Sequence, residues 1–210
     1  MVILFTILVF LFSVIIHEVS HGLMAQSMGD DTAKRAGRLT LNPFPHLDMY
    51  GSILVPLMTF LAFGAFFGYA KPVPYNPANL SDQRFGASKV AIAGPLSNLL
   101  LAIIFGLFLR FLPADVPPIL PILFLIIVRV NLLLMVFNLI PIQPLDGHWL
   151  LLTFLPNRWI EVKYFVVRYG IFMFFALLII LYHYDFLTPL INFLFRVIVG
   201  EDISFFLRSV

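Results

Sequence analysis

Three side chains that could bind a metal ion and move a proton lie together in the apolar N-terminal segment FSVIIHEVSHGLMAQ, residues 12–26. His17 and His21 are four residues apart, so on a helix they stack on one face, about 5–6 Å apart at Cβ, and can share one ion. Glu18 lies beside them. The pattern H-E-x-x-H is typical of zinc hydrolases, in which the glutamate takes a proton from the attacking water. The segment therefore predicts a hydrolytic site with one Zn2+ per chain.

A catalytic zinc ion needs a third protein ligand. The chain has no cysteine, so this ligand must offer nitrogen or oxygen. The donors near the ends of apolar stretches are His46, Asp48, Asp146, His148 and Glu161. In NLIPIQPLDGHW, Pro141 and Pro144 must unwind the chain, and Gly147 frees the turn that follows. We favour Asp146 as the ligand, because a carboxylate on unwound backbone at that depth should face a polar cavity. The alternative is a solvated loop residue.

The composition places these residues in a membrane protein. Of the 210 residues, 61% are hydrophobic and 11% are charged, and the mean hydropathy is +1.00. Soluble domains have about 25% charged residues. The formal charge of +2 and the scattered basic residues exclude the basic face of a nucleic-acid-binding protein. Since the first charged residue is Glu18, the N-terminal stretch lacks the basic region of a secretory signal and is predicted to be a retained span.

Six apolar stretches approach the ~20 residues that cross a hydrocarbon core of ~30 Å. They are residues 1–28, 50–68, 88–112, 119–141, 163–184 and 186–207. We therefore expect an all-α polytopic membrane protein. It should form a single domain over residues 1–210, with a catalytic core at about 1–152 and C-terminal helices at about 160–207.

Basic residues predict the topology, because short loops that hold them tend to stay cytoplasmic. Those of the candidate cytoplasmic loops are Lys34, Arg35, Arg38, Lys71, Arg84, Lys89, Arg158 and Lys163. If the loops at 29–49 and 69–88 are both cytoplasmic, residues 50–68 form a re-entrant segment or lie against the bundle. Five helices then cross, with the N-terminus outside and the C-terminus inside. The alternative is an ordinary sixth crossing.

Two further expectations concern the cytoplasmic side. The segment GRLTLNP, residues 37–43, has the alternation and β-branching of a short strand, which predicts a small β element at the membrane face. His17 lies about 24 Å of helix from Met1 at ~1.5 Å per residue, so the metal site should lie inside the hydrocarbon, just short of the cytoplasmic boundary.

Two of these motifs also carry a family resemblance. HEVSH followed by NLIPIQPLDG resembles the site-2 protease family of intramembrane zinc metalloproteases, whose pattern is H-E-x-x-H and then N-x-x-P-x-x-x-x-D-G. The segments LTLNPFPHLD, GYAKPVPYNP and AGPLSN are similar to segments between those motifs in prokaryotic members. The resemblance covers about residues 12–152, and the chain looks like a minimal member without a PDZ or CBS module.

The resemblance implies roles for the motif residues. His17, His21 and Asp146 would bind zinc, and Glu18 would be the general base. Asn138 matches the asparagine of the second motif, which implies that it holds the substrate carbonyl or strand near the metal.

Other residues keep two interpretations each. Asn98, in AGPLSN, either assists at the substrate or joins helices through a buried amide, while its neighbours Gly94, Pro95 and Ser97 indicate close helix contact.

His148 stands where many members have glycine, and Met49 follows HLD where proline is expected. His46 and His148 either approach the metal or gate access to it, or are interfacial residues. Arg129, in the middle of a span, is expected to pair with a carboxylate or to reach an interface.

The resemblance implies a zinc-dependent endopeptidase that performs regulated intramembrane proteolysis. It would cut a peptide bond in or near the transmembrane segment of a membrane protein with a single transmembrane helix, in the prokaryotic cell membrane and toward the cytoplasm. The substrate must unwind locally, because a helix occupies its own carbonyl groups. The strand at 37–43 could then pair with the unwound segment.

Two other functions are open to the same residues. A zinc transporter or metal sensor would need a second set of ligands in the outer half, where only Arg129 and Asn131 lie deep in the spans, and neither suits zinc. A catalytically inactive scaffold is disfavoured because every motif position is intact. The sequence leaves open the physiological substrate, its cleavage site, prior cleavage by another protease and self-association into a homo-oligomer.

Overall fold

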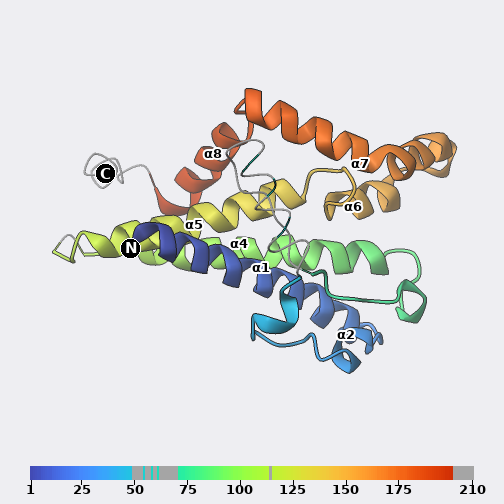
Figure 1. The fold of residues 1–210 in the computed structure, drawn as a ribbon, viewed down its shortest axis with the longest axis horizontal. Coiled ribbons are helices and arrows are strands. Elements are labelled where there is room, and N and C mark those ends of the chain that lie inside the picture. The colour runs from blue at the N-terminus through green and yellow to red at the C-terminus, as the bar shows by residue number, and fades with distance from the viewer. Residues whose placement is uncertain (49–53, 55–57, 59–60, 62–70, 114, 201–210) are drawn as a thin grey trace.

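The computed structural model is built from helices joined by short connections (Figure 1). It describes residues 1–48, 54, 58, 61, 71–113 and 115–200. The helices are α1 (Val2–Ser27), α2 (Thr32–Arg35), α4 (Gly86–Arg110), α5 (Ile119–Asn138), α6 (Gly147–Phe154), α7 (Ile160–His183) and α8 (Leu187–Val199). Three short 3-10 turns accompany them: η1 (Phe44–His46), η3 (Pro77–Asn79) and η4 (Asn157–Trp159). The described residues contain no β-strand.

Four helices, α1, α4, α5 and α7, are long and apolar enough to cross a membrane. The mostly helical membrane fold expected from the sequence is therefore confirmed. The expected count of five or six crossings is not confirmed. The stretch at 186–207 yields the 13-residue helix α8, which at ~1.5 Å per residue is too short for a core of ~30 Å. The segment at 50–68, with its two alternative topologies, lies almost entirely outside the described residues.

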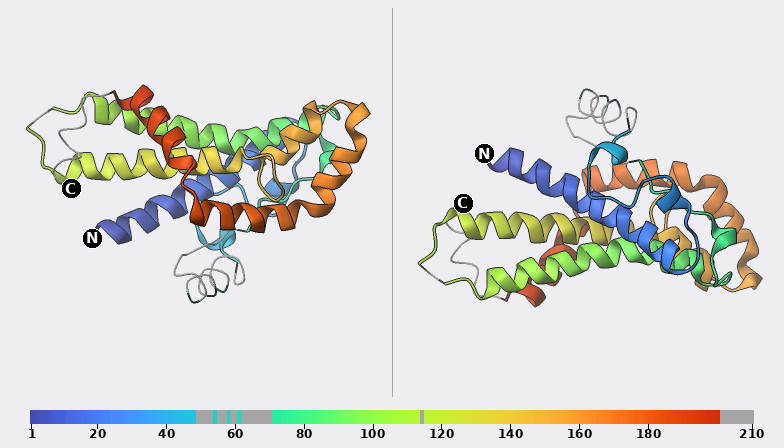
Figure 2. Two further views of the ribbon diagram at one scale, coloured as in Figure 1. Left: turned by 90° about the horizontal axis from the view of Figure 1, so that it is seen from above. Right: turned by 90° about the horizontal axis from the view of Figure 1, so that it is seen from below.

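Helices α1, α4 and α5 form the centre of the molecule and run side by side in all views (Figures 1 and 2). Helix α8 packs across α4 and α5. The shared core consists of Ala102, Leu109, Val128, Leu132, Met135, Val136, Ile191, Phe195 and Val199. At Gly106 an added Cβ would collide with Ile198, so this glycine allows α4 and α8 to approach closely. This bundle is the scaffold on which the candidate site is built.

Helix α7 lies beside the bundle and leaves most of its surface uncovered (Figure 1). Phe174 contacts Phe137 of α5 with ring centroids 6.3 Å apart. A Cβ at Gly170 would lie 2.6 Å from the Cβ of Gln143, so α7 also packs closely on the connection between α5 and α6. Most of the uncovered side chains of α7 are large and apolar, as expected for a helix that faces lipid.

The strand predicted for residues 37–43 is wrong, because these residues form a turn and bends. Gly37 has a positive φ of 66°, which breaks the extended run at its start. The Thr40 hydroxyl accepts from the Asn42 N–H at 3.1 Å, and the Asn42 side chain accepts from the Phe44 N–H at 3.2 Å. These local bonds occupy donors that a sheet ladder would need.

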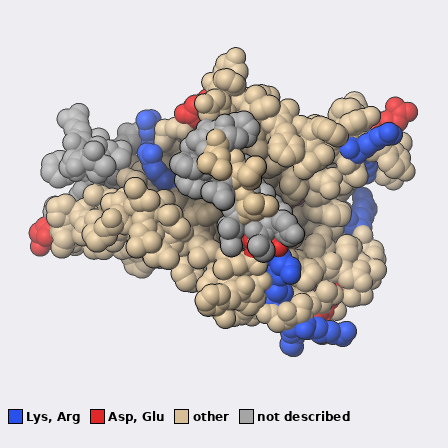
Figure 3. Space-filling model, in the orientation of Figure 1, with Lys and Arg blue, Asp and Glu red and all other residues tan. Residues whose placement is uncertain are grey.

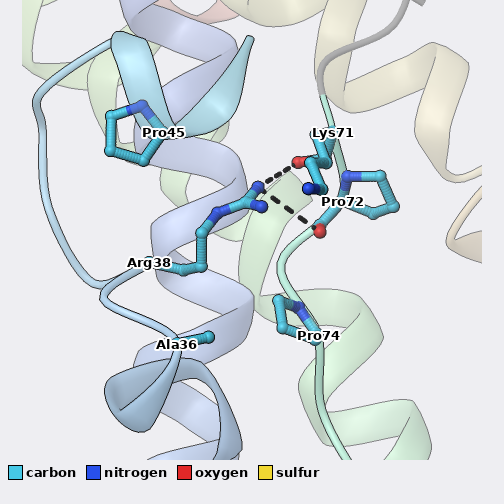
Figure 4. Close-up of a pocket in the computed structure, with 6 residues that line it drawn as sticks. All are labelled: Ala36, Arg38, Pro45, Lys71, Pro72 and Pro74. Atoms are coloured by element: carbon cyan, nitrogen blue, oxygen red, sulfur yellow. Dashed lines mark hydrogen bonds between the residues drawn. The ribbon is translucent and has the colours of Figure 1, made fainter. Parts of the chain in front are cut away.

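Residues 71–76 form an extended segment that crosses the end of α1 without pairing as a strand. The Arg38 guanidinium binds this segment by donating to the carbonyl oxygens of Lys71, at 2.5 Å, and Pro72, at 3.4 Å (Figure 4). The Lys71 N–H donates to the His46 carbonyl at 2.9 Å. The loop after α1 therefore holds the 71–76 segment in place.

Candidate metal centre

Helix α1 presents both imidazoles to the interior of the bundle. His17 and His21 are 5% and 8% exposed, and their ring centroids are 4.6 Å apart with the planes at 88°. Ser13 and Ala25, four residues before and after this pair, are also buried, and the face that they share with the two histidines packs against α4 and α5. Two imidazole rings therefore meet at one place inside the bundle.

The connection between α5 and α6 brings Asp146 to the same place. After α5 ends, the chain makes tight turns, in which the Ile142 N–H donates to the Ile140 carbonyl and the Leu145 N–H to the Ile142 carbonyl. Gly147 starts α6 and lies so close to the Leu139 carbonyl that an added Cβ would collide with backbone atoms. This close approach positions Asp146 with its Oδ2 3.0 Å from His17 Nε2 and 3.3 Å from His21 Nε2.

The arrangement of these three side chains fits a zinc ion. Donor atoms at ~2.0–2.1 Å from a tetrahedral ion lie about 3.3 Å from one another, close to the distances from Asp146 to the two imidazoles. The candidate donor atoms all lie within 4.8 Å of one another. Two neutral imidazoles and one carboxylate also form a donor set that catalytic zinc uses, with room for a fourth ligand.

Hydrogen bonds on the far side of each ring direct the Nε2 atoms toward Asp146. His17 Nδ1 donates to the side-chain oxygen of Asn98 at 2.6 Å, and His21 Nδ1 donates to the Val90 carbonyl at 2.7 Å. Both acceptors lie on α4. Pro95 in the same helix has no N–H to donate, so it loosens the helical bonding of this turn next to the Val90 carbonyl. With Nδ1 protonated in each ring, Nε2 keeps the lone pair that binds a metal.

Gly94 provides the space for the two rings. A Cβ added at this position would lie 2.5 Å from His21 Nε2 and 2.6 Å from His17 Nε2. Neither nitrogen could keep its position beside such a carbon atom. The backbone of α4 therefore forms one wall of the site, and the close helix contact expected at Gly94 is present.

Glu18 is held by the extended segment that crosses α1. The Val73 N–H donates to Glu18 Oε2 at 2.9 Å, and this is the hydrogen bond that the described residues give the carboxylate. Gly22, one turn further along α1, allows the approach, since its Cβ would lie 2.8 Å from Val73 Cγ1 and 2.5 Å from Leu39 Cδ2. One carboxylate oxygen is thus fixed beside the imidazole pair.

Comparison with known proteins identifies the family. The sequence profile of peptidase family M50 matches residues 5–116, more than half of the chain. The chain belongs to peptidase family M50. This is the site-2 protease family, so the resemblance carried by HEVSH and NLIPIQPLDG is confirmed, and the chain is a zinc metalloprotease of the membrane.

Several relatives are named as zinc metalloproteases. One from Bacillus subtilis is 39% identical over 160 residues, which cover 72% of this chain and 69% of the relative. One from Methanocaldococcus jannaschii is 31% identical over 182 residues, with 81% and 84% covered. One from Mycolicibacterium smegmatis is 34% identical over 140 residues, with 66% and 52% covered. No solved structure is significantly similar to the chain.

The other acidic candidates that the sequence gave for this M50 peptidase are not part of the ligand group. Within the described residues, the one group that could hold a metal consists of His17, His21 and Asp146, without Asp48 or Glu161. The Asn138 amide donates to the Leu134 carbonyl of its own helix at 2.9 Å. The role that the family resemblance assigns to Asn138 stays a prediction.

The two other histidines that the sequence singled out have local hydrogen-bond partners. His46 is buried and donates from Nε2 to the Thr40 carbonyl at 2.8 Å. His148 is also buried and donates from Nδ1 to the Leu145 carbonyl at 2.6 Å. Neither is part of the three-residue group. These bonds stabilise the loop after α1 and the turn into α6, and direct roles of the two rings at the metal stay predictions.

Arg129 of α5 points to α8. Its guanidinium lies 3.5 Å from the Asn192 side-chain oxygen and 5.5 Å from the centroid of the Phe195 ring. Within the described residues its recorded partners are thus an amide and an aromatic ring, in place of the carboxylate that the sequence suggested.

Sequence reasoning missed three contacts of the metal centre: those of the Asn98 oxygen, the Val90 carbonyl and the Val73 N–H. The sequence offered a signal for Asn98 alone, because an amide inside an apolar helix must find a partner. The other two are backbone groups, which every residue type carries, so only the fold reveals them.

Proposed function

We propose that this M50 peptidase hydrolyses a peptide bond in or near the transmembrane segment of a membrane protein with a single transmembrane helix. The convergence of His17, His21 and Asp146 inside the spanning helices carries the proposal. These three residues would bind one zinc ion per chain, with Glu18 as the general base. Such cleavage within the bilayer is the chemical step of regulated intramembrane proteolysis.

The geometry supports different catalytic roles for the metal, Glu18 and Asn138. When bound, zinc would supply a Lewis acid that favours ionisation of water and polarises an amide carbonyl. Glu18 is adjacent to His17 in sequence, and its Oε2 is fixed by Val73 at 2.9 Å. Its other oxygen can accept a proton from the attacking water and later deliver it to the leaving amine. Asn138 would hold the substrate carbonyl or strand.

A helical substrate must unwind before Glu18 can act on it. Its carbonyl groups are hydrogen-bonded within the helix, and a few residues must leave that pattern before one faces the site. Because residues 37–43 form no strand, edge pairing with that segment is not part of the proposal.

The distribution of charge supports an active site that faces the cytoplasm in the prokaryotic cell membrane. Lys and Arg side chains gather mainly at the end of the molecule where α2, the segment before α4 and the connection from α6 to α7 lie (Figure 3). Basic loops tend to stay cytoplasmic. His17 lies about 24 Å along α1 from its start at ~1.5 Å per residue, which supports a site near that boundary and an N-terminus outside.

A substitution at Glu18 tests the proposal. Glu18→Gln should retain one zinc per chain and lose cleavage of a single-pass membrane substrate in detergent. His17→Ala should lose the zinc itself. Leu23→Ala, at an exposed position of the same helix, is the control and should keep both properties. Cleavage by Glu18→Gln at the wild-type rate would refute the assignment of the base.

A zinc transporter finds less support in the described residues. They contain one group of candidate ligands, and Asn131 and Arg129, the polar residues deep in other spans, are engaged with Asn98 and Asn192. Zinc flux through liposomes containing the wild-type protein would favour the transporter, whereas cleavage without flux would exclude it.

A further inference from the structure

A row of buried polar side chains extends from His17 into the middle of the bundle, away from the candidate metal ligands. Asn98 of α4 and Asn131 of α5 are fully buried, and Ser13 of α1 is 4% exposed. Each of these residues comes from a different helix, and they meet where α1, α4 and α5 pack together. Buried amides in a membrane span are costly unless paired, so this row requires an explanation.

We propose that Asn131 is a positioning residue for the metal centre. It fixes the direction of the Asn98 amide, and through it the tautomer of His17. The inference rests on the proposed ligand role of His17. Asn131 itself contacts none of His17, His21 and Asp146 through the hydrogen bonds of the described residues.

The orientation of the Asn131 side-chain amide is set by a backbone carbonyl, which can only accept a hydrogen bond. The Asn131 Nδ2 donates to the Ile127 carbonyl at 2.8 Å and to the Ser13 hydroxyl oxygen at 3.0 Å. If the amide were turned over, its oxygen would face the Ile127 oxygen, and two acceptors would oppose each other. The Asn131 oxygen must therefore point the other way, toward α4.

The orientation of the Asn131 amide in turn fixes the orientation of the Asn98 amide. Its Nδ2 donates to the Asn131 oxygen at 2.9 Å and lies 3.4 Å from the Ser13 carbonyl, both of which accept. The Asn98 oxygen is thereby turned toward His17, where it accepts from Nδ1 at 2.6 Å. Nε2 lies within hydrogen-bond distance of Asp146 Oδ2, at 3.0 Å, and a metal bound there would take the Nε2 lone pair that a proton on Nδ1 leaves free.

The opposite orientation of the Asn98 amide would prevent His17 from binding a metal through Nε2. With the Asn98 amide reversed, its NH2 group would face His17 and require the lone pair on Nδ1. The proton would then be on Nε2, where the metal would bind. Reversal is opposed by Asn131, because two amide oxygens would then face each other at 2.9 Å. Without Asn131, the remaining restraint is the Ser13 carbonyl at the longer distance of 3.4 Å.

The test compares Asn131→Leu, which is close in size and has no polar atoms, with Asn192→Leu in α8 as a matched control. The hydrogen bond of His17 Nδ1–H is measured by 1H and 15N NMR of histidine-labelled protein in detergent with zinc bound. Zinc affinity is measured by competition with a chelator. We expect Asn131→Leu to shift the His17 Nδ1–H resonance to that of a weaker hydrogen bond and to raise the zinc Kd about 10-fold, the range seen when partners of ligating histidines are removed. Asn192→Leu should match the wild type.

A purely structural role for Asn131 gives a different result. Asn131→Leu would then change the unfolding temperature but leave the His17 Nδ1–H resonance and the zinc Kd at wild-type values, which would overturn the inference. If Asn131→Leu does not fold, Asn131→Ala takes its place in the NMR measurement on His17 and in the measurement of the zinc Kd. His17→Ala separates the two proposals: zinc binding unaffected by His17→Ala refutes the ligand assignment, whereas zinc lost in His17→Ala but unaffected in the Asn131 variant refutes the positioning role alone.

Discussion

The Val73 backbone N–H donates to Glu18 Oε2 at 2.9 Å, across 55 residues of sequence. The carboxylate proposed as the general base is therefore positioned by a segment outside its own helix. Pro72 and Pro74 flank Val73, and neither has an N–H, so the Val73 donor is isolated on this part of the segment. The geometry of the base depends on how closely this segment lies against α1.

Enlarging Gly22 should impair catalysis without removing zinc. A Cβ there would lie 2.8 Å from Val73 Cγ1, so Gly22→Val must push the segment away from α1 and break its bond to Glu18. A displacement of about 1 Å at a catalytic group can cost up to ~100-fold in rate, and we expect a loss of kcat of about 10- to 100-fold. Zinc content per chain and kcat are measured together, with Leu23→Ala as the control. A normal kcat for Gly22→Val would show that the Val73 contact does not matter.

The sequence predicted the convergence of His17, His21 and Asp146, and the structure places these residues together. The reason is that ionisable residues in apolar helices must find partners, and only a few were available. For Asn98 the sequence indicated only that its amide needs a partner, and the contacts of Val90 and Val73 were beyond prediction. They depend on the rotation of α4 and on the path of an extended segment, and no residue type marks either of them.

The fold was predictable at the level of apolar stretches and less so in the loops. Length and hydropathy located α1, α4, α5 and α7, because lipid imposes both on a spanning helix. The strand predicted at 37–43 failed because alternation also occurs in bends whose Thr40 and Asn42 side chains bond to the backbone. The stretch at 186–207 was apolar enough to span, but its helix α8 ends at Val199.

Gly94→Ala should abolish zinc binding. The added carbon would lie within 2.6 Å of both His17 Nε2 and His21 Nε2, where a zinc ion would also approach. We expect the zinc Kd to rise by about 100-fold or more, the upper range for altered surroundings of a ligand. Gly106→Ala is the matched control on the same helix, because its Cβ would meet Ile198 of α8, away from the site. Both variants are assayed for zinc by chelator competition and for folding by circular dichroism. Equal zinc affinity in the two variants would contradict the role of Gly94.

Asp30 should make the loop region after α1 less stable as the pH falls into the acidic range. Burial alone would raise the pKa of this carboxyl, but hydrogen bonds from Thr32, Asn79 and Asn76 lower the pKa below its ordinary 3.8. The folded state therefore holds the proton less tightly than the unfolded state. The stabilisation is complete above the ordinary pKa and is lost as the pH falls through the lower folded pKa.

Asp30→Asn should remove this acid-dependent part and lower the unfolding temperature at pH 7, since an amide offers one acceptor oxygen to four donors. Thermal unfolding in detergent at pH 7 and at steps below pH 4 measures both effects. Asp115→Asn, in the connection between α4 and α5, is the control. A wild-type pH profile for Asp30→Asn would locate the acid sensitivity elsewhere.

Tyr75→Phe should leave the protein as stable as the wild type or more stable. The Tyr75 hydroxyl is buried and finds no hydrogen-bond partner among the described residues, while the ring packs against the cluster of Ala25, Leu80 and Val90. Burial and the negative charge of Asp146 raise the pKa of the phenol, so the hydroxyl is neutral at pH 7 and its removal changes no charge. An unpaired buried hydroxyl costs about 1–3 kcal/mol, and phenylalanine keeps the packing without that cost. Unfolding temperatures in detergent are compared with those of Tyr164→Phe, whose side chain is exposed. A lower unfolding temperature for Tyr75→Phe alone would mean that the hydroxyl makes a stabilising bond.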